Sequence, residues 1–140
     1  MFRFQIIIEY DGTGYVGWQS QKNGKSVQKE IEKILSKILK IKIKVISAGR
    51  TDSGVHSTNQ SAHFDIKNNI LNKYQFISSI NHFLSKKNIS IKKIIKKNNK
   101  FHARFSAKER EYKYIILNRN APPVIDKNKV WHLRSKLDMN

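Results

Sequence analysis

The sequence predicts an α+β fold in which two helices cover one face of a mainly antiparallel sheet. Short apolar or alternating runs, typical of strands, occupy residues 2–10, 41–47, 59–66 and 89–97. Two stretches between them repeat apolar residues every three or four positions, as amphipathic helices do. The resulting order, β-α-β-β-α-β, is the split βαβ arrangement, which leaves the second face of the sheet open.

The first half of the chain begins with the strand "FRFQIIIEY" and a glycine-rich turn. Ser26 is the expected N-cap of the first helix, because its hydroxyl can accept a hydrogen bond from the first helical turn. The apolar residues of this helix share one face: Val27, Ile31, Ile34, Leu35, Ile38 and Leu39. The alternating run "IKIKVIS" should then lead as a strand into the turn "GRTDSGVH", from which "NQSAHFDI" returns as the third strand.

In the second half, Asn72 is the expected N-cap of another helix. Its predicted inner face consists of Tyr74, Ile77, Ile80, Phe83 and Leu84. A strand over 89–97 and a longer one over 103–117 follow, and two tyrosines of the longer strand, Tyr112 and Tyr114, should share a face. Two consecutive prolines end this region.

The composition restricts the class of protein. A chain of 140 residues has the size of one domain with a modest core. It contains no cysteine, which excludes disulfides and thiolate metal sites. No apolar run approaches the roughly 20 residues that a membrane span needs, and the N-terminal segment lacks a secretory cleavage pattern. We therefore expect a soluble, cytoplasmic protein that contacts no membrane.

The formal net charge of +18 has two interpretations that the sequence leaves open. A polyanion partner such as nucleic acid would be bound through its phosphates. Alternatively, the abundance of Lys, Ile and Asn reflects AT-rich codons, whatever the function. The run "KKNISIKKIIKK" has the same ambiguity, since lysines on an alternating strand form either a solvated sheet edge or a track for phosphates.

Gly12, Gly14 and Gly17 spell G-x-G-x-x-G directly after the first strand. The dinucleotide-binding context fails, because nine residues separate the third glycine from the helix and no acidic residue ends the second strand. A flexible loop whose backbone can approach a ligand is the better interpretation. The five histidines lack the close spacing of a metal site, so no metal is expected.

The stretch "SAGRTDSGVHS" places one carboxylate, Asp52, in a turn of a basic chain. The residues alone allow two roles, closure of the turn through backbone N–H groups or chemistry on a ligand. Arg50 lies two positions earlier, where it would favour the ionised carboxylate, and the flanking glycines leave room for a bulky ligand. The second carboxylate of a glycosidic hydrolase has no obvious candidate, since Asp65 lies a whole strand away.

The chain resembles the TruA family of tRNA pseudouridine synthases in four stretches, which occur in the family's order: "YDGTGYVGWQSQ", "SAGRTDSGVHS", "FHARFSAKEREYKYII" and "VWHLRSKLDMN". They span essentially the whole chain, and "GRTDSGVH" is a highly specific string. The resemblance implies a ferredoxin-like or RNA-recognition-like unit, in agreement with the predicted β-α-β-β-α-β order. It also implies conversion of uridine to pseudouridine in the anticodon stem-loop of tRNA, with no cofactor and no metal.

The resemblance assigns roles to particular residues. The family's catalytic aspartate falls on Asp52, its motif arginine on Arg50, which would help to hold the target nucleotide out of the helix, and its active-site tyrosine on Tyr112, which would stack on the uracil. Further RNA contacts are expected at four residues of the same motifs: Gln19, His56, Arg104 and Arg110.

The resemblance also implies how the chain is organised. Residues 1–120 would form the catalytic domain, and residues 121–140 would connect it to a second domain that lies outside this sequence. The implied partners are tRNA and, for the full-length form, a second copy in a homodimer. Three alternatives remain: a non-catalytic RNA-binding module, an inactive fragment of the synthase, and a glycosidic-bond hydrolase acting on nucleic acid. The aromatic-rich signature of common RNA-recognition modules is missing, which disfavours the first.

Overall fold

The computed structural model describes residues 1–139 of the chain. The chain forms two compact units, Met1–Lys108 and Glu109–Asn140, here called the N-terminal and C-terminal units. The expected functional division after residue 120 stays a prediction.

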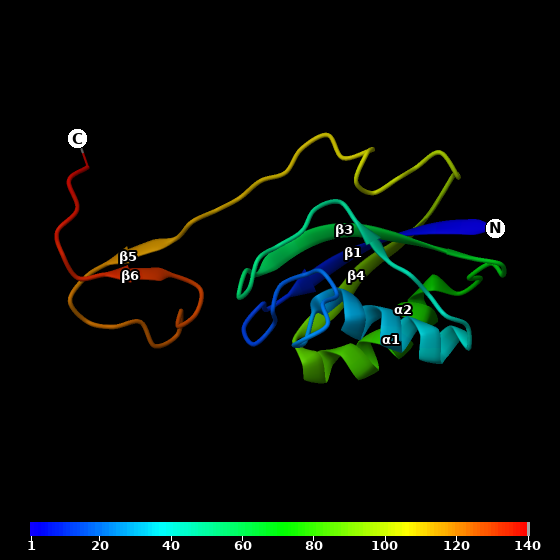
Figure 1. The fold of residues 1–140 in the computed structure, drawn as a ribbon, viewed down its shortest axis with the longest axis horizontal. Coiled ribbons are helices and arrows are strands. Elements are labelled where there is room, and N and C mark those ends of the chain that lie inside the picture. Colours follow the sequence, from blue (N-terminus) through cyan, green and yellow to red (C-terminus); the bar gives the residue numbers. More distant parts are fainter. Residues whose placement is uncertain (140) are drawn as a thin grey trace. The chain divides into compact units, whose positions relative to one another are not determined.

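The N-terminal unit has the predicted α+β architecture, with both helices on one face of a four-stranded antiparallel sheet (Figure 1). The strand order in the sheet is β2-β3-β1-β4, so the long strands β1 and β3 lie at its centre. In chain order the elements are β1 (Phe2–Tyr10), α1 (Val27–Leu39), β2 (Ile46–Ser47), β3 (Ser57–Ile66), α2 (Lys73–Leu84), the 3₁₀ turn η1 (Ser85–Lys87) and β4 (Ile89–Lys97).

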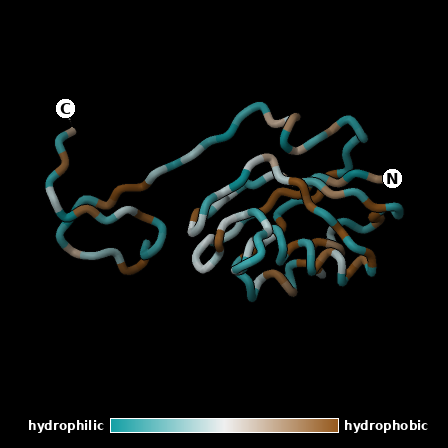
Figure 2. The backbone as a smooth tube through the Cα atoms, in the orientation of Figure 1, coloured by the Kyte–Doolittle hydropathy of each residue, from teal (hydrophilic) through white to brown (hydrophobic). Residues whose placement is uncertain are grey.

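The core lies between the sheet and the helices, where hydrophobic positions gather in Figure 2. Side chains alternate along a strand, so β1 buries its even-numbered residues, Phe4, Ile6, Ile8 and Tyr10, against the helices. Both predicted caps are confirmed: the side chain of Ser26 accepts the N–H of Lys29, and that of Asn72 accepts the N–H of Gln75.

The second strand is shorter than predicted: of residues 41–47, only Ile46–Ser47 pairs with β3, and residues 41–45 form no strand. The alternation of the run is still visible, since Ile43 and Val45 are buried. Their N–H groups are bound by side chains of α1 and not by a neighbouring strand: Ser36 Oγ accepts from Ile43 at 2.9 Å, and Glu32 Oε1 accepts from Val45 at 2.9 Å. These two acceptors satisfy the backbone without a ladder.

The inner face of α2 is narrower than predicted. Ile80 and Leu84 are buried and Ile77 packs partly against the core. Tyr74, however, is 86% exposed, because it lies in the first turn, beyond the edge of the helix–sheet contact. Phe83 is also exposed at 38%, and the ammonium group of Lys37 covers its ring at 4.7 Å.

The long strand predicted over 103–117 is wrong. Residues 103–106 form turns, and only β5 (Ile116–Asn118) is a strand, paired in parallel with β6 (Trp131–Leu133) within the C-terminal unit. A strand needs a partner for its backbone groups. The partner that the chain supplies is a three-residue strand, and it limits β5 to the same length.

The sheet face opposite the helices is not fully open, which corrects a second expectation. Segment 98–106 crosses it after β4 and is held by side chains of the sheet. The guanidinium of Arg3 donates to the carbonyls of Asn99 and Phe101 at 2.9 and 2.6 Å. The N–H of Ala103 donates to Nδ1 of His63 at 3.1 Å. This segment covers one end of the face.

Candidate active site

Asp52 lies in loop 49–56, which connects β2 to β3 at the edge where β1 ends and β4 begins (Figure 1). Its backbone carbonyl closes a turn by accepting the N–H of Val55 at 3.2 Å. Its side chain is exposed, and the carboxylate makes no hydrogen bond or ion pair with any residue of 1–139. The carboxylate is therefore not used to close its own loop and is available to a ligand.

Arg50 is exposed on the same loop. Within the described part of the chain, its guanidinium forms no ion pair with Asp52. The loop between β2 and Arg50 is held by the carbonyl of Gly49, which accepts from Ser47 Oγ at 2.8 Å and from Gln60 Nε2 at 2.5 Å. The arginine and the aspartate thus project from a loop whose first residues are fixed to the sheet.

Loop 11–18, the glycine-rich stretch after β1, is the support on which loop 49–56 lies. A side chain at Gly12 would overlap the carbonyl of Val55, and one at Gly17 would overlap the carbonyl of Thr51. Gly17 also has φ +111°, a conformation that favours glycine. These two glycines therefore admit the backbone of the neighbouring loop, whereas a side chain at Gly14 would enter open space. The approach of this loop to a ligand stays a prediction.

Four hydrogen bonds join loop 49–56 to the end of β1 and to loop 11–18, on both sides of Asp52. Before it, Thr51 is held twice: its carbonyl accepts the N–H of Trp18 at 3.0 Å, and its hydroxyl lies 2.8 Å from that of Tyr10. After it, the carbonyl of Tyr15 accepts from the Ser53 hydroxyl at 3.1 Å and from the Gly54 N–H at 3.3 Å. The backbone that carries Asp52 is thus fixed, while its carboxylate is not.

Loop 11–18 is in turn attached to the turn between α2 and β4. The Tyr15 hydroxyl donates to the carbonyl of Lys87 at 2.6 Å, and the N–H of Asp11 donates to the carbonyl of Asn88 at 3.0 Å. The ammonium group of Lys87 also lies 2.6 Å from a carboxylate oxygen of Glu30 in α1. Burial, with a smaller contribution from Glu30, raises the pKa of Tyr15, so its hydroxyl stays a donor.

His56 joins the same two loops through one ring nitrogen. Its Nδ1 lies 3.0 Å from the N–H of Gly12 and 3.0 Å from Oδ1 of Asp11. When Nδ1 is unprotonated it accepts from Gly12, and when protonated it faces the carboxylate. Hydrogen bonds from Thr13, together with the charge of His56, lower the pKa of Asp11. The histidine expected to contact RNA thus also has a role within the protein.

Segment 98–106 carries Arg104 and is fixed by an ion pair and a buried histidine. Arg3 binds both oxygens of Asp65, at 2.8 and 2.7 Å. These bonds lower the pKa of Asp65 and raise that of Arg3. His63 is 1% exposed, and burial, reinforced by the charge of Arg3, lowers its pKa. A neutral imidazole is what the N–H of Ala103 requires as an acceptor.

The structure places the expected RNA-contacting residues in different parts of the chain. Gln19 is exposed directly after Trp18, so it borders the loop that carries Asp52. Arg104 is exposed on segment 98–106 beside the ring of Phe105. Arg110 and Tyr112 belong to the C-terminal unit, where Tyr112 is 64% exposed. The N-terminal unit therefore groups Asp52, Arg50, His56 and Gln19, and the role of Tyr112 stays a prediction.

The supports of Asp52 were not identified from the sequence. Tyr10, Thr51 and Trp18 lie within the two motifs, but their side chains gave no signal of a mutual contact. The docking role of His63 had no signal beyond its neighbour Phe64.

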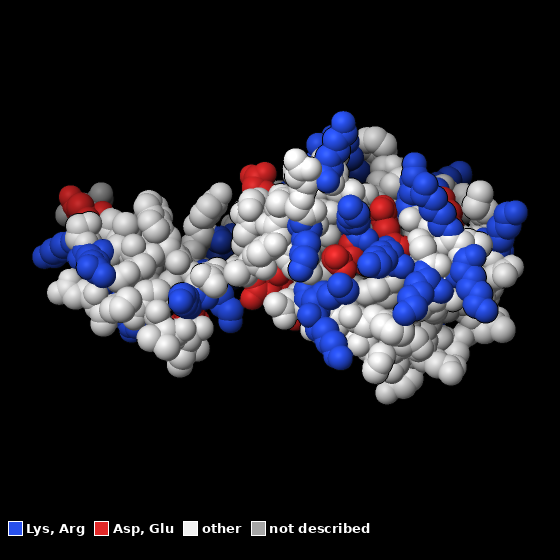
Figure 3. All heavy atoms as spheres, turned by 60° about the horizontal axis from the view of Figure 1, so that its bottom comes forward, with Lys and Arg blue, Asp and Glu red and all other residues white. Residues whose placement is uncertain are grey.

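Charge is spread widely over the N-terminal unit. Figure 3 views it from the side of the helices and shows Lys and Arg side chains across that surface, with a few carboxylates between them. Several exposed lysines of α1 and its C-terminal end contribute: Lys29, Lys33, Lys37 and Lys40. β4, with the lysine run, lies at the edge of the sheet, as the solvated-edge interpretation requires. Charge alone therefore does not locate a binding surface.

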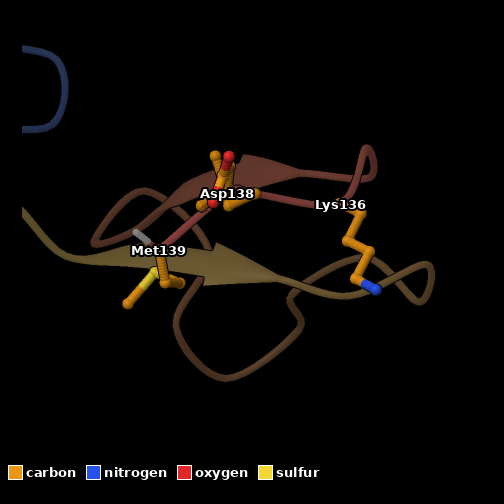
Figure 4. A pocket seen from close by; sticks show the side chains of 4 residues that line it. Lys136, Asp138 and Met139 are labelled. Atoms are coloured by element: carbon orange, nitrogen blue, oxygen red, sulfur yellow. The ribbon is translucent and has the colours of Figure 1, made fainter.

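The C-terminal unit contains an open hollow lined by Lys136, Leu137, Asp138 and Met139, whose labelled side chains extend in different directions and do not converge (Figure 4). Residues 1–139 contain no group of three His, Asp or Glu side chains placed to hold a metal ion. No helix of the described chain has the length and apolar character that crossing a membrane requires.

Comparison with known proteins gives one consistent result. Residues 6–106 match the family described as tRNA pseudouridine synthase. The chain is 55% identical over 139 residues to "tRNA pseudouridine synthase A" of Pelagibacter ubique, and 42% identical over 140 residues to the protein of that name from Anaplasma marginale. Each match covers 99% of this chain and 56% of the relative, so the chain spans about half the length of these relatives.

A third protein of that name, from Neorickettsia sennetsu, is 44% identical over 138 residues, which are 99% of this chain and 57% of the relative. The region matched by the family contains both supporting loops and the segment across the sheet. The family match covers more than half of the chain, and the relatives match it over nearly its whole length. The chain belongs to the tRNA pseudouridine synthase family.

Proposed function

We propose that this chain carries the catalytic aspartate of a tRNA pseudouridine synthase and that Asp52 acts on a uridine turned out of the anticodon stem-loop. The observation that supports the proposal best is the state of Asp52: its carboxylate is exposed and unpaired within residues 1–139, on a loop fixed at both neighbouring residues. A surface that only bound RNA would gain nothing from a carboxylate among phosphates.

The reaction fits the residue types. The bond between N1 and C1′ breaks, the uracil turns over, C5 bonds to C1′, the proton of C5 leaves to solvent and N1 gains a proton. No atoms are gained overall, so neither a cofactor nor an energy source is needed. An ionised Asp52 can serve as nucleophile or as base in this sequence.

Base extrusion is the costly step before the chemistry, at a few kcal/mol. Stacking of the uracil on the ring of Tyr112 would return about 1–3 kcal/mol of it. Arg50 would hold the extruded nucleotide. Contacts from Gln19, His56, Arg104 and Arg110, and lysines on the sheet face, would bind the RNA backbone. We also propose a cytoplasmic location and, for the full-length protein, a homodimer.

One labelled substrate distinguishes the candidate functions. Unmodified tRNA with tritium at C5 of uridine is incubated with the protein expressed from its complete reading frame, and with its Asp52→Ala variant. Pseudouridine formation releases tritium to water, whereas hydrolysis leaves it in free uracil. We expect tritium release from the wild type, none from the variant, and tRNA binding by both. Free uracil would identify a hydrolase, and binding without either product would identify a non-catalytic module.

A further inference from the structure

We propose that Tyr10 is a positioning residue for Asp52: its hydroxyl, fixed at the end of β1, holds Thr51 and thereby the peptide that carries the catalytic carboxylate. The inference rests on the proposed function, in which Asp52 reacts with the uridine.

Tyr10 is held rigidly. It is the last residue of β1 and is paired with Ser57 of β3 and Ile89 of β4. Its side chain is 3% exposed, and its ring lies 5.9 Å from that of Trp18. Because the ring is enclosed in this way, the position of the Tyr10 hydroxyl oxygen is fixed. That atom lies 2.8 Å from the hydroxyl of Thr51, which is 41 positions away in the chain.

Thr51 transmits this placement to its neighbour. Its carbonyl is fixed from the other direction by the N–H of Trp18 at 3.0 Å, and the absence of a side chain at Gly17 permits that approach. The hydrogen bond from Trp18 therefore fixes the carbonyl of the peptide between Thr51 and Asp52. The hydrogen bond between Tyr10 and the Thr51 side chain fixes the Cα of Thr51. Beyond Asp52, Ser53 and Gly54 are bound by the carbonyl of Tyr15.

Asp52 itself has no such restraint within the described chain. Its carboxylate makes no hydrogen bond there, so only the backbone aims it. A reacting group has to be held to within roughly 0.5 Å, and a displacement of about 1 Å can cost about 100-fold in rate. The buried side chain of Tyr10 is hydrogen-bonded to Thr51, the residue directly before Asp52. Loss of this bond should therefore slow the chemical step and leave tRNA binding intact.

The test compares Tyr10→Phe, Thr51→Val and the double variant, in the protein expressed from its complete reading frame and at a temperature where circular dichroism shows all variants folded. Single-turnover tritium release measures chemistry, and filter binding measures the tRNA Kd. We expect each single variant to be slower by roughly 10- to 100-fold with Kd within about twofold of the wild type. The double variant should be no slower than the slower single variant, because both remove one bond.

Thr51→Ser keeps the hydroxyl and should react within about threefold of the wild-type rate, whereas Thr51→Val should be slow. A purely volumetric role would give the opposite order, because valine keeps the volume of threonine and serine loses a methyl group. Tyr74→Phe is the matched control, since that tyrosine is 86% exposed on α2, and it should be indistinguishable from the wild type. Wild-type rates in Tyr10→Phe, or losses that multiply in the double variant, would overturn the positioning role.

Amide hydrogen exchange tests the same role independently of catalysis. In Tyr10→Phe, the N–H groups of Gly54 and Val55 should exchange faster than in the wild type, while that of Ile31 within α1 should not. Exchange rates at all three N–H groups equal to those of the wild type would overturn the inference, even in an active enzyme. A wild-type protein that binds tRNA and releases no tritium would instead overturn the proposed function, and exchange would still decide the role of Tyr10.

Discussion

Nδ1 of His63, a buried atom of β3, accepts the backbone N–H of Ala103 at 3.1 Å and so fixes the segment that crosses the sheet. Five other groups face this imidazole from the elements around it: Arg3, Asp65, Phe101, His102 and the backbone of Ile46, whose hydrogen bond opposes the lowering of the pKa of His63. Protonation of Nδ1 would place its N–H against the N–H of Ala103, so two donors would face each other and the hydrogen bond would be lost. The docking of segment 98–106 therefore depends on a neutral histidine.

This dependence predicts a loss of stability in weak acid. Folding lowers the pKa of His63 below its ordinary value of about 6.5, so below that pH the unfolded chain binds a proton that the folded chain does not. The contribution is fully present above about pH 6.5 and decreases as the pH falls toward the folded pKa. Urea unfolding between about pH 7.5 and 5 should show this decrease, and His63→Gln should make the profile flatter.

His82→Gln is the control for that profile, because His82 is exposed on α2. It should leave the pH dependence as in the wild type. An equally steep profile in His63→Gln would show that other groups cause the loss.

Arg3 is expected to contribute more to stability than its partner Asp65. The aspartate has one partner here, whereas the arginine also binds the carbonyls of Asn99 and Phe101. Both side chains are partly exposed, so we expect Arg3→Gln to lower the free energy of unfolding by about 1–2 kcal/mol and Asp65→Asn by about 1 kcal/mol or less. Urea unfolding near neutral pH measures both.

The ion pair also has a predicted acid limit. Arg3 lowers the pKa of Asp65, so the stabilisation is present above its ordinary pKa of about 3.9 and is lost as the pH falls through the lower folded value. The difference between wild type and Asp65→Asn should therefore disappear in strong acid. A difference that persists there would mean that the substitution acts by another route.

Gly17→Ala should destabilise the N-terminal unit and lower activity. Its new methyl group would overlap the carbonyl of Thr51, and φ +111° is unfavourable for alanine. We expect a loss of about 2–4 kcal/mol in urea unfolding, which combines backbone strain with displacement of loop 49–56. Gly14→Ala is the matched control: its φ is +79°, but its methyl group would enter open space, so about 1 kcal/mol is expected. Equal losses would show that backbone strain alone acts.

Tyr112 can be tested with little effect on folding, because its side chain is 64% exposed. If it stacks on the uracil, Tyr112→Ala should lower kcat/KM by roughly 10- to 100-fold, as expected for a loss of about 1–3 kcal/mol. Tyr112→Phe keeps a stacking ring and should lose less. Tyr114→Ala, at a residue 90% exposed, is the control. Equal effects at both tyrosines would argue against a specific stacking role.

Local patterns predicted the elements that depend on local interactions. β1, α1, α2 and β4 follow from periodicity, and both helix caps were identified from one side chain each. The strands predicted over 41–45 and 103–117 were wrong for a common reason: an extended backbone needs partners from elsewhere in the chain. Glu32 and Ser36 supply such partners for the first segment, and the periodicity of α1 does not indicate that these two side chains bind backbone N–H groups.

The candidate site shows the same limit. Asp52 and Arg50 could be proposed because the motif "GRTDSGVH" is specific and contiguous. Its supports could not, since the bond between Tyr10 and Thr51 joins two residues whose types are common in strands and turns. The packing of Gly12 and Gly17 against loop 49–56 could not be predicted either, because glycine permits a close approach without indicating what approaches.

The backbone-to-backbone contact of loops 11–18 and 49–56 has a consequence for chain length. Side chains can adjust to a neighbour by changing rotamer, but two abutting main chains cannot, so neither loop has slack for an added or deleted residue. The exposed residues 67–69, which follow β3, should tolerate an inserted residue. The same insertion in either loop would misalign the aspartate. The lengths of these two loops are thus matched to each other.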